Sequence, residues 1–486
     1  MDKSLVMVDI SKFLNDSKSL IVAPAGYGKT HTIVDCLLTY KGNKKILVLT
    51  HTHAGIASLR SKIQRYNVPS HKYELDTISG HALELAQTYH MDKNDFPAED
   101  QIGELLEFAL KIAEKLYRAR PIIEVLKSKY EHLIVDEYQD CTIPQHNMIM
   151  SMALSLKTHI LGDSMQGIFS FRNSVLVDMD GDAKLMEFRN NTQYLDTPWR
   201  WQNAGNFDLG KDLDAIRVKL QNEKDINLAD FENVTTVISG VDDYRKSGTM
   251  CRNLLFQMAK EDSLLLIHPN SMVKTPRERY ISNFRFLRMI ESIDDKDYYK
   301  FCKECDNRYG ESLLMYLLDF CRKVCLKTAV NAWFRDGTVK NKREDRDKLI
   351  SAKLSRICEN LKECKSYALV AELIMCIMRL PNNNTTRSGF INDLITILND
   401  AYRCNDTALN ALKRNRDKCR KLGRKVDGRY IGTTLLTKGM EYNTVVVLNA
   451  HEFDEPKHLY VALTRCCKNL IVMSEQMVLH PYNNVH

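Results

Sequence analysis

LIVAPAGYGKTHT, residues 20–32, is an apolar run followed by a loop of small residues and by Gly28-Lys29-Thr30. This order predicts a strand, a tight loop and a helix, with Ala23 where the phosphate-loop spacing normally has its first glycine. Small residues are needed because successive backbone N–H groups must curve around a phosphate at the positive end of a helix. The candidate nucleotide-binding residues are Ala23, Pro24, Ala25, Gly26, Tyr27, Gly28, Lys29, Thr30 and His31.

Two side chains of this loop have distinct expected roles. The Lys29 ammonium is expected to reach the β- and γ-phosphates of ATP, and the Thr30 hydroxyl to bind Mg²⁺. The alternative is a plain strand–helix turn, because Gly-Lys-Thr also occurs by chance. The next acidic segment of the chain weighs against that alternative.

A second strand-like run ends in Asp136-Glu137-Tyr138-Gln139-Asp140. In a parallel sheet the carboxyl ends of the strands form the edge at which ligands bind. Asp136 is therefore expected to hold the magnesium, and Glu137 to activate a water for cleavage of the phosphoanhydride. The alternative is that these acids only solvate the end of a strand. With the phosphate loop, they predict an ATP hydrolase that uses Mg²⁺.

A third run, LGDSMQGIFSFR at residues 161–172, again leads from a strand into a polar loop. Gln166 is a candidate sensor of the γ-phosphate. Phe169 and Phe171 offer two flat faces for unpaired nucleic-acid bases. The alternative for such an aromatic pair is a place in the core.

The pattern along the chain predicts an α/β fold with two P-loop-type domains, each a parallel sheet flanked by helices. Short apolar runs alternate with helix-length segments up to residue 203, helical periodicity dominates the middle, and strands return near the end. The first domain is expected at 1–203, with a small helical insert at about 90–130. The second is expected at 204–279 and 429–486, with a strand at 432–436, interrupted by a helical insertion at 280–428.

Composition excludes several classes of protein. The 486 residues are 44% hydrophobic, with 20 Gly and 11 Pro, which is typical of a packed globular chain. No apolar run approaches the ~20 residues that a membrane span needs. The first residues lack the pattern of a secretory signal, so we expect a cytoplasmic protein that keeps its 14 cysteines as thiols. The net charge of +7 is mild, so any polyanion site should be local.

Six motifs in a fixed order resemble the UvrD/Rep-type helicases of superfamily one. Besides the three runs above, the matching segments are LDTPWRWQN at 195–203, TTLLTKGMEYNTVVVL at 433–448 and LYVALTR at 459–465. The resemblance implies two RecA-like domains with ATP between them and 3′ to 5′ movement along DNA. It also implies that Arg200 and Arg465 neutralise the transferred phosphate, that Trp199 stacks on adenine and that Glu441 binds the ribose.

The departures from the family concern mainly the strand-binding residues. No glutamine precedes the phosphate loop, and Leu435 replaces a histidine of the fifth motif. The segments that would line the single-strand track contain Thr52 and Thr77, which are the remaining nucleic-acid candidates. The compact chain further resembles the UvrD-like subunits of Gabija-type anti-phage systems, which implies a nuclease partner of the OLD/TOPRIM type.

Two features leave alternatives open. The residues from Lys413 to Arg429 include nine cations among 17 residues, which suits phosphate contacts or a solvated helix face equally well. Cys302, Cys305, Cys321 and Cys325 have spacings that a metal could use, but small apolar positions in a helical core are the favoured interpretation.

Three functional hypotheses follow from the sequence. The leading one is a DNA translocase or helicase driven by ATP. The second is a regulatory ATPase that senses DNA ends or single strands and controls a partner nuclease, with little unwinding of its own. The third, a scaffold that binds nucleotide without turnover, is disfavoured by Lys29, Glu137 and Arg465.

Overall fold

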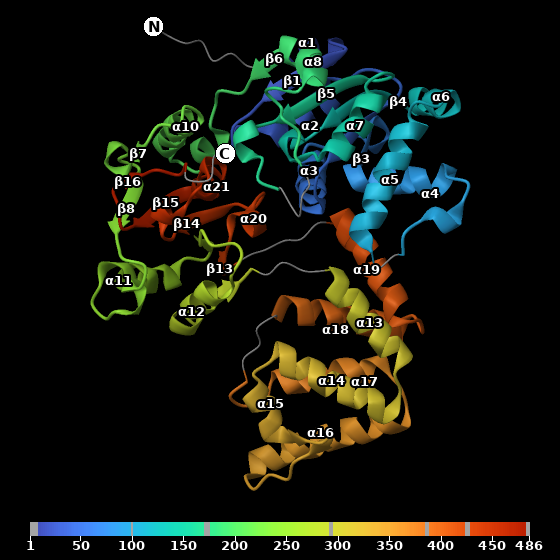
Figure 1. The fold of residues 1–486 in the computed structure, drawn as a ribbon, viewed down its shortest axis with the longest axis vertical. Helices are drawn as coiled ribbons and strands as arrows, with labels where there is room; N and C mark the ends of the chain where they lie inside the picture. Colours follow the sequence, from blue (N-terminus) through green and yellow to red (C-terminus); the bar gives the residue numbers. More distant parts are fainter. Residues whose placement is uncertain are drawn as a thin grey trace. The chain divides into compact units, whose positions relative to one another are not determined.

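The computed structural model describes residues 8–98, 101–169, 175–290, 295–383, 388–422 and 428–482. The chain divides into two compact units. The first comprises residues 1–98, 103–290 and 421–486, and the second comprises 99–102 and 291–420. The first unit contains two six-stranded parallel sheets, each with helices on both faces (Figure 1). The expected α/β class with two RecA-like P-loop domains is confirmed.

The first sheet has the strand order β3-β2-β4-β5-β1-β6. Its strands are β1 (Lys18–Val22), β2 (Lys45–Thr50), β3 (Tyr73–Thr77), β4 (Tyr130–Val135), β5 (Lys157–Gly162) and β6 (Thr192–Tyr194). Strand β1 pairs with β5, placing Ile21 beside Leu161. Because neighbouring residues of a strand point to opposite faces, Leu20 enters one core and Ile21 the other.

Helices cover both faces of this sheet, as the crossovers between parallel strands require. The core that contains Ile21 is closed by α1 (Ile10–Asn15), α2 (Lys29–Thr39) and α3 (His53–Arg65). The core that contains Leu20 is closed by α4 (Ile78–Tyr89), α5 (Ile102–Leu116), α6 (Arg120–Lys129), α7 (Ile143–Met152) and α8 (Met186–Asn190). Helices α5 and α6 occupy the region expected to be a helical insert.

The second sheet has the order β10-β13-β9-β14-β15-β8. Its strands are β8 (Val234–Ile238), β9 (Leu264–Ile267), β10 (Arg288–Met289), β13 (Arg429–Gly432), β14 (Tyr442–Val447) and β15 (Cys466–Ser474). Leu265 and Ile267 pack with α10 (Phe207–Gln221) and α21 (Pro456–Leu463). Leu264 and Leu266 pack on the other face with α11 (Met250–Gln257) and α12 (Thr275–Asn283).

Two expected boundaries differ in the structure. The strand expected at 432–436 is wrong: β13 ends at Gly432 and the short helix α20 spans Thr434–Thr437. The Thr437 hydroxyl there donates to the Thr433 carbonyl, 2.8 Å away, which closes a helical turn. The helical unit begins at residue 291 rather than 280, because Tyr280, Phe284 and Leu287 belong to the core beneath β9.

The second unit is helical around one core of its own. Its helices are α13 (Asp295–Asn307), α14 (Gly310–Val324), α15 (Lys327–Trp333), α16 (Asp345–Glu363), α17 (Tyr367–Met378), α18 (Ser388–Arg403) and α19 (Ala408–Leu422). A small hairpin joins β11 (Phe334–Arg335) to β12 (Thr338–Val339). Throughout the part of the chain that the structure describes, no helix is both long and apolar enough to cross a membrane.

The four cysteines with metal-like spacing lie in this helical core. Cys302, Cys305, Cys321 and Cys325 are all buried among leucine and aromatic side chains. Burial raises the pKa of the Cys302, Cys305 and Cys321 thiols above the ordinary range, so they stay protonated. Among the described residues, no cluster of His, Cys, Asp and Glu side chains is arranged to hold a metal. These cysteines act as small apolar residues.

Candidate nucleotide-binding site

The phosphate loop leaves β1 and enters α2 through two glycines with positive φ. Gly26 has φ 76° and Gly28 has φ 99°, a region that favours glycine because it has no Cβ. Space is also restricted: a Cβ on Gly26 would lie 2.8 Å from the Trp201 ring, and one on Gly28 would lie 3.1 Å from the Trp199 ring. The sequence therefore uses glycine for both conformation and close packing. No side chain caps the start of α2, so a phosphate can bind at the N-terminus of this helix.

Lys29 is buried, and its ammonium lies beside the candidate catalytic base. The Lys29 Nζ atom is 3.3 Å from Glu137 Oε2 and 3.5 Å from the Ala23 carbonyl oxygen. Burial by itself would lower the pKa of Lys29, but Glu137, Asp163 and Asp136 outweigh it and raise this pKa. The neighbouring acids therefore keep Lys29 positively charged, and a positive charge is what binding of phosphate groups requires.

The two adjacent acids at the end of β4 have opposite pKa shifts. Burial and the neighbouring Glu137 charge raise the pKa of Asp136. Burial also acts to raise the pKa of Glu137, but the Lys29 and Lys438 cations outweigh it and lower the pKa below the usual range. Glu137 has a left-handed backbone, with φ 54°, and its Oε2 accepts a 2.5 Å hydrogen bond from Gln139 Nε2. Glu137 is thus an oriented carboxylate that is deprotonated at neutral pH.

Thr30 and Asp136 suit a magnesium ion chemically. Both offer oxygen ligands, which Mg²⁺ prefers, and Thr30 lies in the first turn of α2. Asp136 is 5% exposed and its backbone N–H donates to the Leu49 carbonyl, so the carboxylate is held at the sheet edge. A divalent cation would stabilise the charged form of this buried acid, whose pKa burial otherwise raises.

Arg200 connects the phosphate loop to the second sheet. It lies in the short helix α9 (Trp199–Asn203), and its backbone N–H donates to the Gly26 carbonyl oxygen at 3.0 Å. Its guanidinium binds Glu441 Oε1 at 2.7 Å through Nη2, and the Thr464 carbonyl through Nη1. Burial would lower its pKa, but Glu441 outweighs this and raises it. Arg200 is therefore cationic at the junction of the two domains.

Arg465 directly follows Thr464, whose carbonyl binds Arg200, and is 2% exposed. Its Nε donates to the Val461 carbonyl at 2.9 Å and its Nη2 to the Thr464 hydroxyl at 3.2 Å. Burial and the nearby Arg200 cation lower its pKa to about 10. A buried arginine that another arginine destabilises in this way favours an incoming anion such as a phosphate.

Trp199, expected to stack on adenine, and Glu441, expected to bind the ribose, differ in the contacts that they make. Trp199 is 46% exposed beside Gly28, so its ring is accessible at the loop. Glu441 Oε1 accepts a hydrogen bond from Arg200 Nη2, and the Glu441 side chain is 55% exposed. His31 is exposed on α2, where its ring contacts Asp35 at 2.9 Å and the Tyr66 hydroxyl at 3.1 Å. Tyr27 is buried, and desolvation and Asp214 raise the pKa of its phenol.

Gln166 is held by a network that also joins the two domains. Its Nε2 donates to Asp163 Oδ2 at 3.0 Å, and Asp163 Oδ1 accepts from Arg217 Nη2 at 2.8 Å. Arg217 lies on α10, which packs against the second sheet. Tyr460, on α21, makes a further link: its hydroxyl accepts from the Ala25 N–H at 3.2 Å. Gln166 is thus directed to Asp163 in this state.

Lys438 is a site residue to which the sequence assigned no role. It is buried, and its ammonium lies 2.5 Å from both carboxylate oxygens of Asp140 and also donates to the Gln166 carbonyl. The signal for it was its place in the fifth motif, three residues before Glu441. Tyr460 lies within the LYVALTR motif but was given no role, and Arg217 lies in no motif, since its partner Asp163 is remote in the sequence.

The nucleic-acid candidates lie on the segments that follow β2, β3 and β5. The Phe169 ring stacks on His51 at 5.9 Å between centroids, and Lys438 Nζ is 4.7 Å from the Phe169 centroid. Thr52 and Thr77 cap helices, since their hydroxyls accept from the N–H groups of Gly55 and Gly80. Phe171 lies outside the described residues.

Two parallel α/β domains and a glycine-containing loop between β1 and α2 form the arrangement that P-loop nucleotide-binding proteins have. Residues 9–172 match the family described as AAA domain. Among curated proteins no match was found. The chain is similar to the Pif1 helicase from Candida albicans, with a TM-score of 0.42 and 12% identity over 98% of this chain and 96% of that one. It is also similar to a chain from a structure of two coordinating Pif1 helicases at forked double-stranded DNA, with a TM-score of 0.38 and 12% identity, covering 97% of this chain and 92% of that one.

Proposed function

We propose that the chain is an ATP-dependent DNA translocase or helicase of superfamily one, of the UvrD-like kind, that tracks single-stranded DNA from 3′ to 5′. The observation that carries this proposal is the path of Arg200. Its backbone binds the phosphate loop at Gly26, and its side chain binds Glu441 and Thr464 of the second domain. A ligand at the loop would therefore act on both domains at once.

The residues of the cleft suit hydrolysis of a phosphoanhydride. The phosphates of ATP would replace Glu137 as the partner of Lys29, which frees the Glu137 carboxylate to orient a water. That water attacks the γ-phosphorus, its proton passes to Glu137 and ADP leaves. Mg²⁺ held by Thr30 and Asp136 would neutralise charge on the phosphates, as would Arg200 and Arg465.

Loss of the γ-phosphate would change the contacts between the domains. Arg200 binds Gly26 of the phosphate loop through its backbone and Glu441 of the second domain through its side chain. Lys438 of the second domain binds Asp140 at the acidic strand end, and Arg465 is held within the second domain by the Val461 carbonyl. Each hydrolysis cycle would open and close this interface, and a strand held by both domains would move by a step. Trp199 beside the loop supplies a face for adenine.

The first test is ATP hydrolysis by the purified chain without nucleic acid, with single-stranded DNA and with duplex DNA. We expect single strands to stimulate turnover strongly, and duplex DNA with no free strand to stimulate it less. Equal turnover in all three conditions would contradict a motor that tracks one strand. Tailed duplexes with a 3′ or a 5′ single strand then test the polarity.

One observation favours a second candidate, a regulatory ATPase that controls a nuclease of the OLD/TOPRIM type in anti-phage defence. Phe169 is in contact with His51 and Lys438, and the Thr52 and Thr77 hydroxyls serve as helix caps, so this state presents little of a strand track. A strand-displacement assay with and without an added nuclease of the OLD/TOPRIM type distinguishes the two. Efficient unwinding of tailed duplexes by the chain alone would contradict the regulatory candidate.

A further inference from the structure

A pocket of about 190 Å³ lies at the N-terminal edge of the second sheet, away from the nucleotide site. Its lining residues are Asp262, Phe286, Arg288, Gly428, Arg429 and Tyr430. Arg288 begins β10 and Arg429 begins β13, and these strands are neighbours in the sheet. Strand β13 ends at Gly432, on the side of Lys438, so the pocket is at the opposite end of that strand from the nucleotide cleft.

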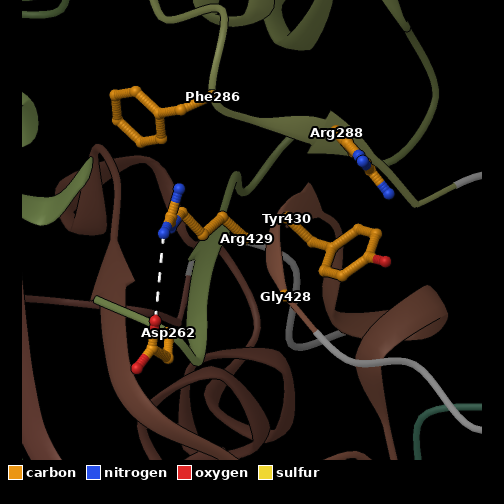
Figure 2. A pocket seen from close by; sticks show the side chains of 6 residues that line it. All are labelled: Asp262, Phe286, Arg288, Gly428, Arg429 and Tyr430. Atoms are coloured by element: carbon orange, nitrogen blue, oxygen red, sulfur yellow. Dashed lines mark ion pairs between the residues drawn. The ribbon is translucent and has the colours of Figure 1, made fainter. Parts of the chain in front are cut away.

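Two arginines give this pocket its charge. Arg429 donates from Nε to the Glu261 carbonyl at 2.6 Å, which fixes the guanidinium while its terminal nitrogens face the pocket region (Figure 2). The pocket's acid, Asp262, is wholly exposed and 4.0 Å from Arg429 Nη2, so solvent screens this pair. Arg288 is exposed, and among the described residues no acid forms an ion pair with its side chain.

Two aromatic rings complete the lining. Figure 2 shows Phe286 and Arg288 entering from the β10 side, and Arg429 and Tyr430 from β13. Phe286 and Tyr430 are half-buried, so each ring is supported by the core and still presents apolar surface. Gly428, with φ 115°, lets the chain enter β13 beside the Tyr430 ring. One fixed guanidinium, on Arg429, and one exposed guanidinium, on Arg288, lie next to supported rings and suit a phosphate joined to a flat base.

The pocket includes the last residue of the basic segment between Lys413 and Arg429. Arg429 is the last of the nine cations between Lys413 and Arg429. At the other end of the run, Arg414 is already paired with Asp400, at 3.0 Å, and with Asp406. Among the described cations of this run, Arg429 lines the pocket, where it lies beside Arg288 from the adjacent strand β10.

We propose that this pocket is a second contact for single-stranded nucleic acid, in which Arg288 and Arg429 bind a backbone phosphate and the adjoining base packs on Tyr430 or Phe286. The inference rests on the proposed function and adds to it a contact on the second domain, remote from Phe169. A strand bound in this pocket contacts the second domain independently of the nucleotide site. A motor that steps along a strand needs separate contacts of this kind on its two domains.

The test is binding of a fluorescent thirty-nucleotide oligothymidylate by the full chain, followed by anisotropy over a range of salt concentrations. Arg288→Ala should weaken binding about three- to tenfold and reduce the slope of log affinity against log salt by about 0.7, the value for one lost phosphate contact. Tyr430→Leu should weaken binding with an unchanged slope, because it removes a ring and no charge. Arg279→Ala, an exposed arginine on α12, is the matched control.

Wild-type affinity and slope in both pocket variants would overturn the proposal, while stimulation of ATP hydrolysis by the same oligonucleotide would leave the motor function standing. Competition by thymidine monophosphate as strong as that by the oligonucleotide would also overturn it, since the pocket would then be a mononucleotide site. A wild-type chain that neither binds the oligonucleotide nor responds to it in hydrolysis would contradict the proposed function itself.

Discussion

The Lys438 ammonium lies 2.5 Å from both carboxylate oxygens of Asp140, although 298 residues separate the two in the sequence. Both side chains are buried, at 5% and 2% exposure. Burial raises the pKa of Asp140 to about 6, and Lys438 acts against this rise. The same ammonium binds the Gln166 carbonyl and lies over the Phe169 ring. One cation therefore contacts the acidic strand end and the candidate strand-binding segment.

Lys438→Met should uncouple these two segments. Removal of one partner from a buried ion pair costs roughly 3–5 kcal/mol, and here the loss falls on a contact between the two domains. We expect the stimulation of ATP hydrolysis by single-stranded DNA to fall to near the basal rate, as measured by phosphate release with and without oligothymidylate. Lys457→Met, which changes an exposed lysine on α21, should behave as wild type. Full stimulation in Lys438→Met would contradict the coupling.

Glu137→Gln should retain ATP binding while hydrolysis falls by ~10² or more, because the amide cannot accept the proton of the attacking water. The variant keeps the shape of the side chain and its contact with Gln139. Equilibrium binding of a fluorescent ATP analogue and steady-state phosphate release measure the two effects separately. Glu124→Gln, on the exposed face of α6, serves as the control. Undiminished turnover would remove Glu137 from the proposed mechanism.

The sequence singled out candidate residues where a short segment carries the whole signal. The phosphate loop, the acids after β4 and the two arginines each lie in one motif, and the structure places them near one another. The partnership of Lys438 with Asp140 depends on tertiary contact and has no local pattern. The prediction of a strand at 432–436 was wrong because Thr434 begins a helical turn, in which its hydroxyl forms a hydrogen bond of 2.6 Å with His458 Nδ1. Such a contact overrides the β propensity of an apolar run.

Phe169→Ala and Phe171→Ala should each weaken binding of single-stranded DNA by ~1–3 kcal/mol, the range for loss of one base stack. For Phe169 the reason is its position at the sheet edge beside Lys438. For Phe171, outside the described residues, the prediction rests on its spacing in the motif. Fluorescence anisotropy gives both affinities. Phe256→Ala, which removes a 47% exposed ring on α11, is the control. Wild-type affinity in Phe169→Ala or Phe171→Ala would contradict base stacking on that phenylalanine.

Trp199→Ala should raise the KM for ATP about tenfold with kcat changed little, because loss of a stacked face removes roughly 0.5–1.5 kcal/mol beyond the lost contact area. The ring lies against Gly28 and is 46% exposed, so its truncation leaves the core intact. Steady-state hydrolysis at varied ATP separates the two constants. Tyr194→Ala, 67% exposed on β6, tests for a general effect of removing a surface ring. An unchanged KM in Trp199→Ala would place adenine elsewhere.

His268 should make the stability of the second domain depend on pH. The ring is 4% exposed, and its Nδ1 accepts from the Asn270 N–H at 3.1 Å. Burial and the nearby Arg277 lower its pKa to about 4 from the ordinary 6.5. The unfolded chain therefore binds a proton first as the pH falls. The contribution of His268 is complete above pH ~6.5 and is lost toward pH ~4, by at most ~1.4 kcal/mol per pH unit.

The matched variant for this effect is His268→Asn, whose amide oxygen can still accept from the Asn270 N–H but does not titrate. Thermal unfolding midpoints at pH values of about 7 and 5 compare the two proteins. We expect the wild-type midpoint to fall further than that of the variant over this interval, because only the wild type gains a proton at this position on unfolding. Parallel shifts in both proteins would mean that the pKa of His268 is the same in the folded and unfolded chains, and would assign the acid sensitivity to other groups.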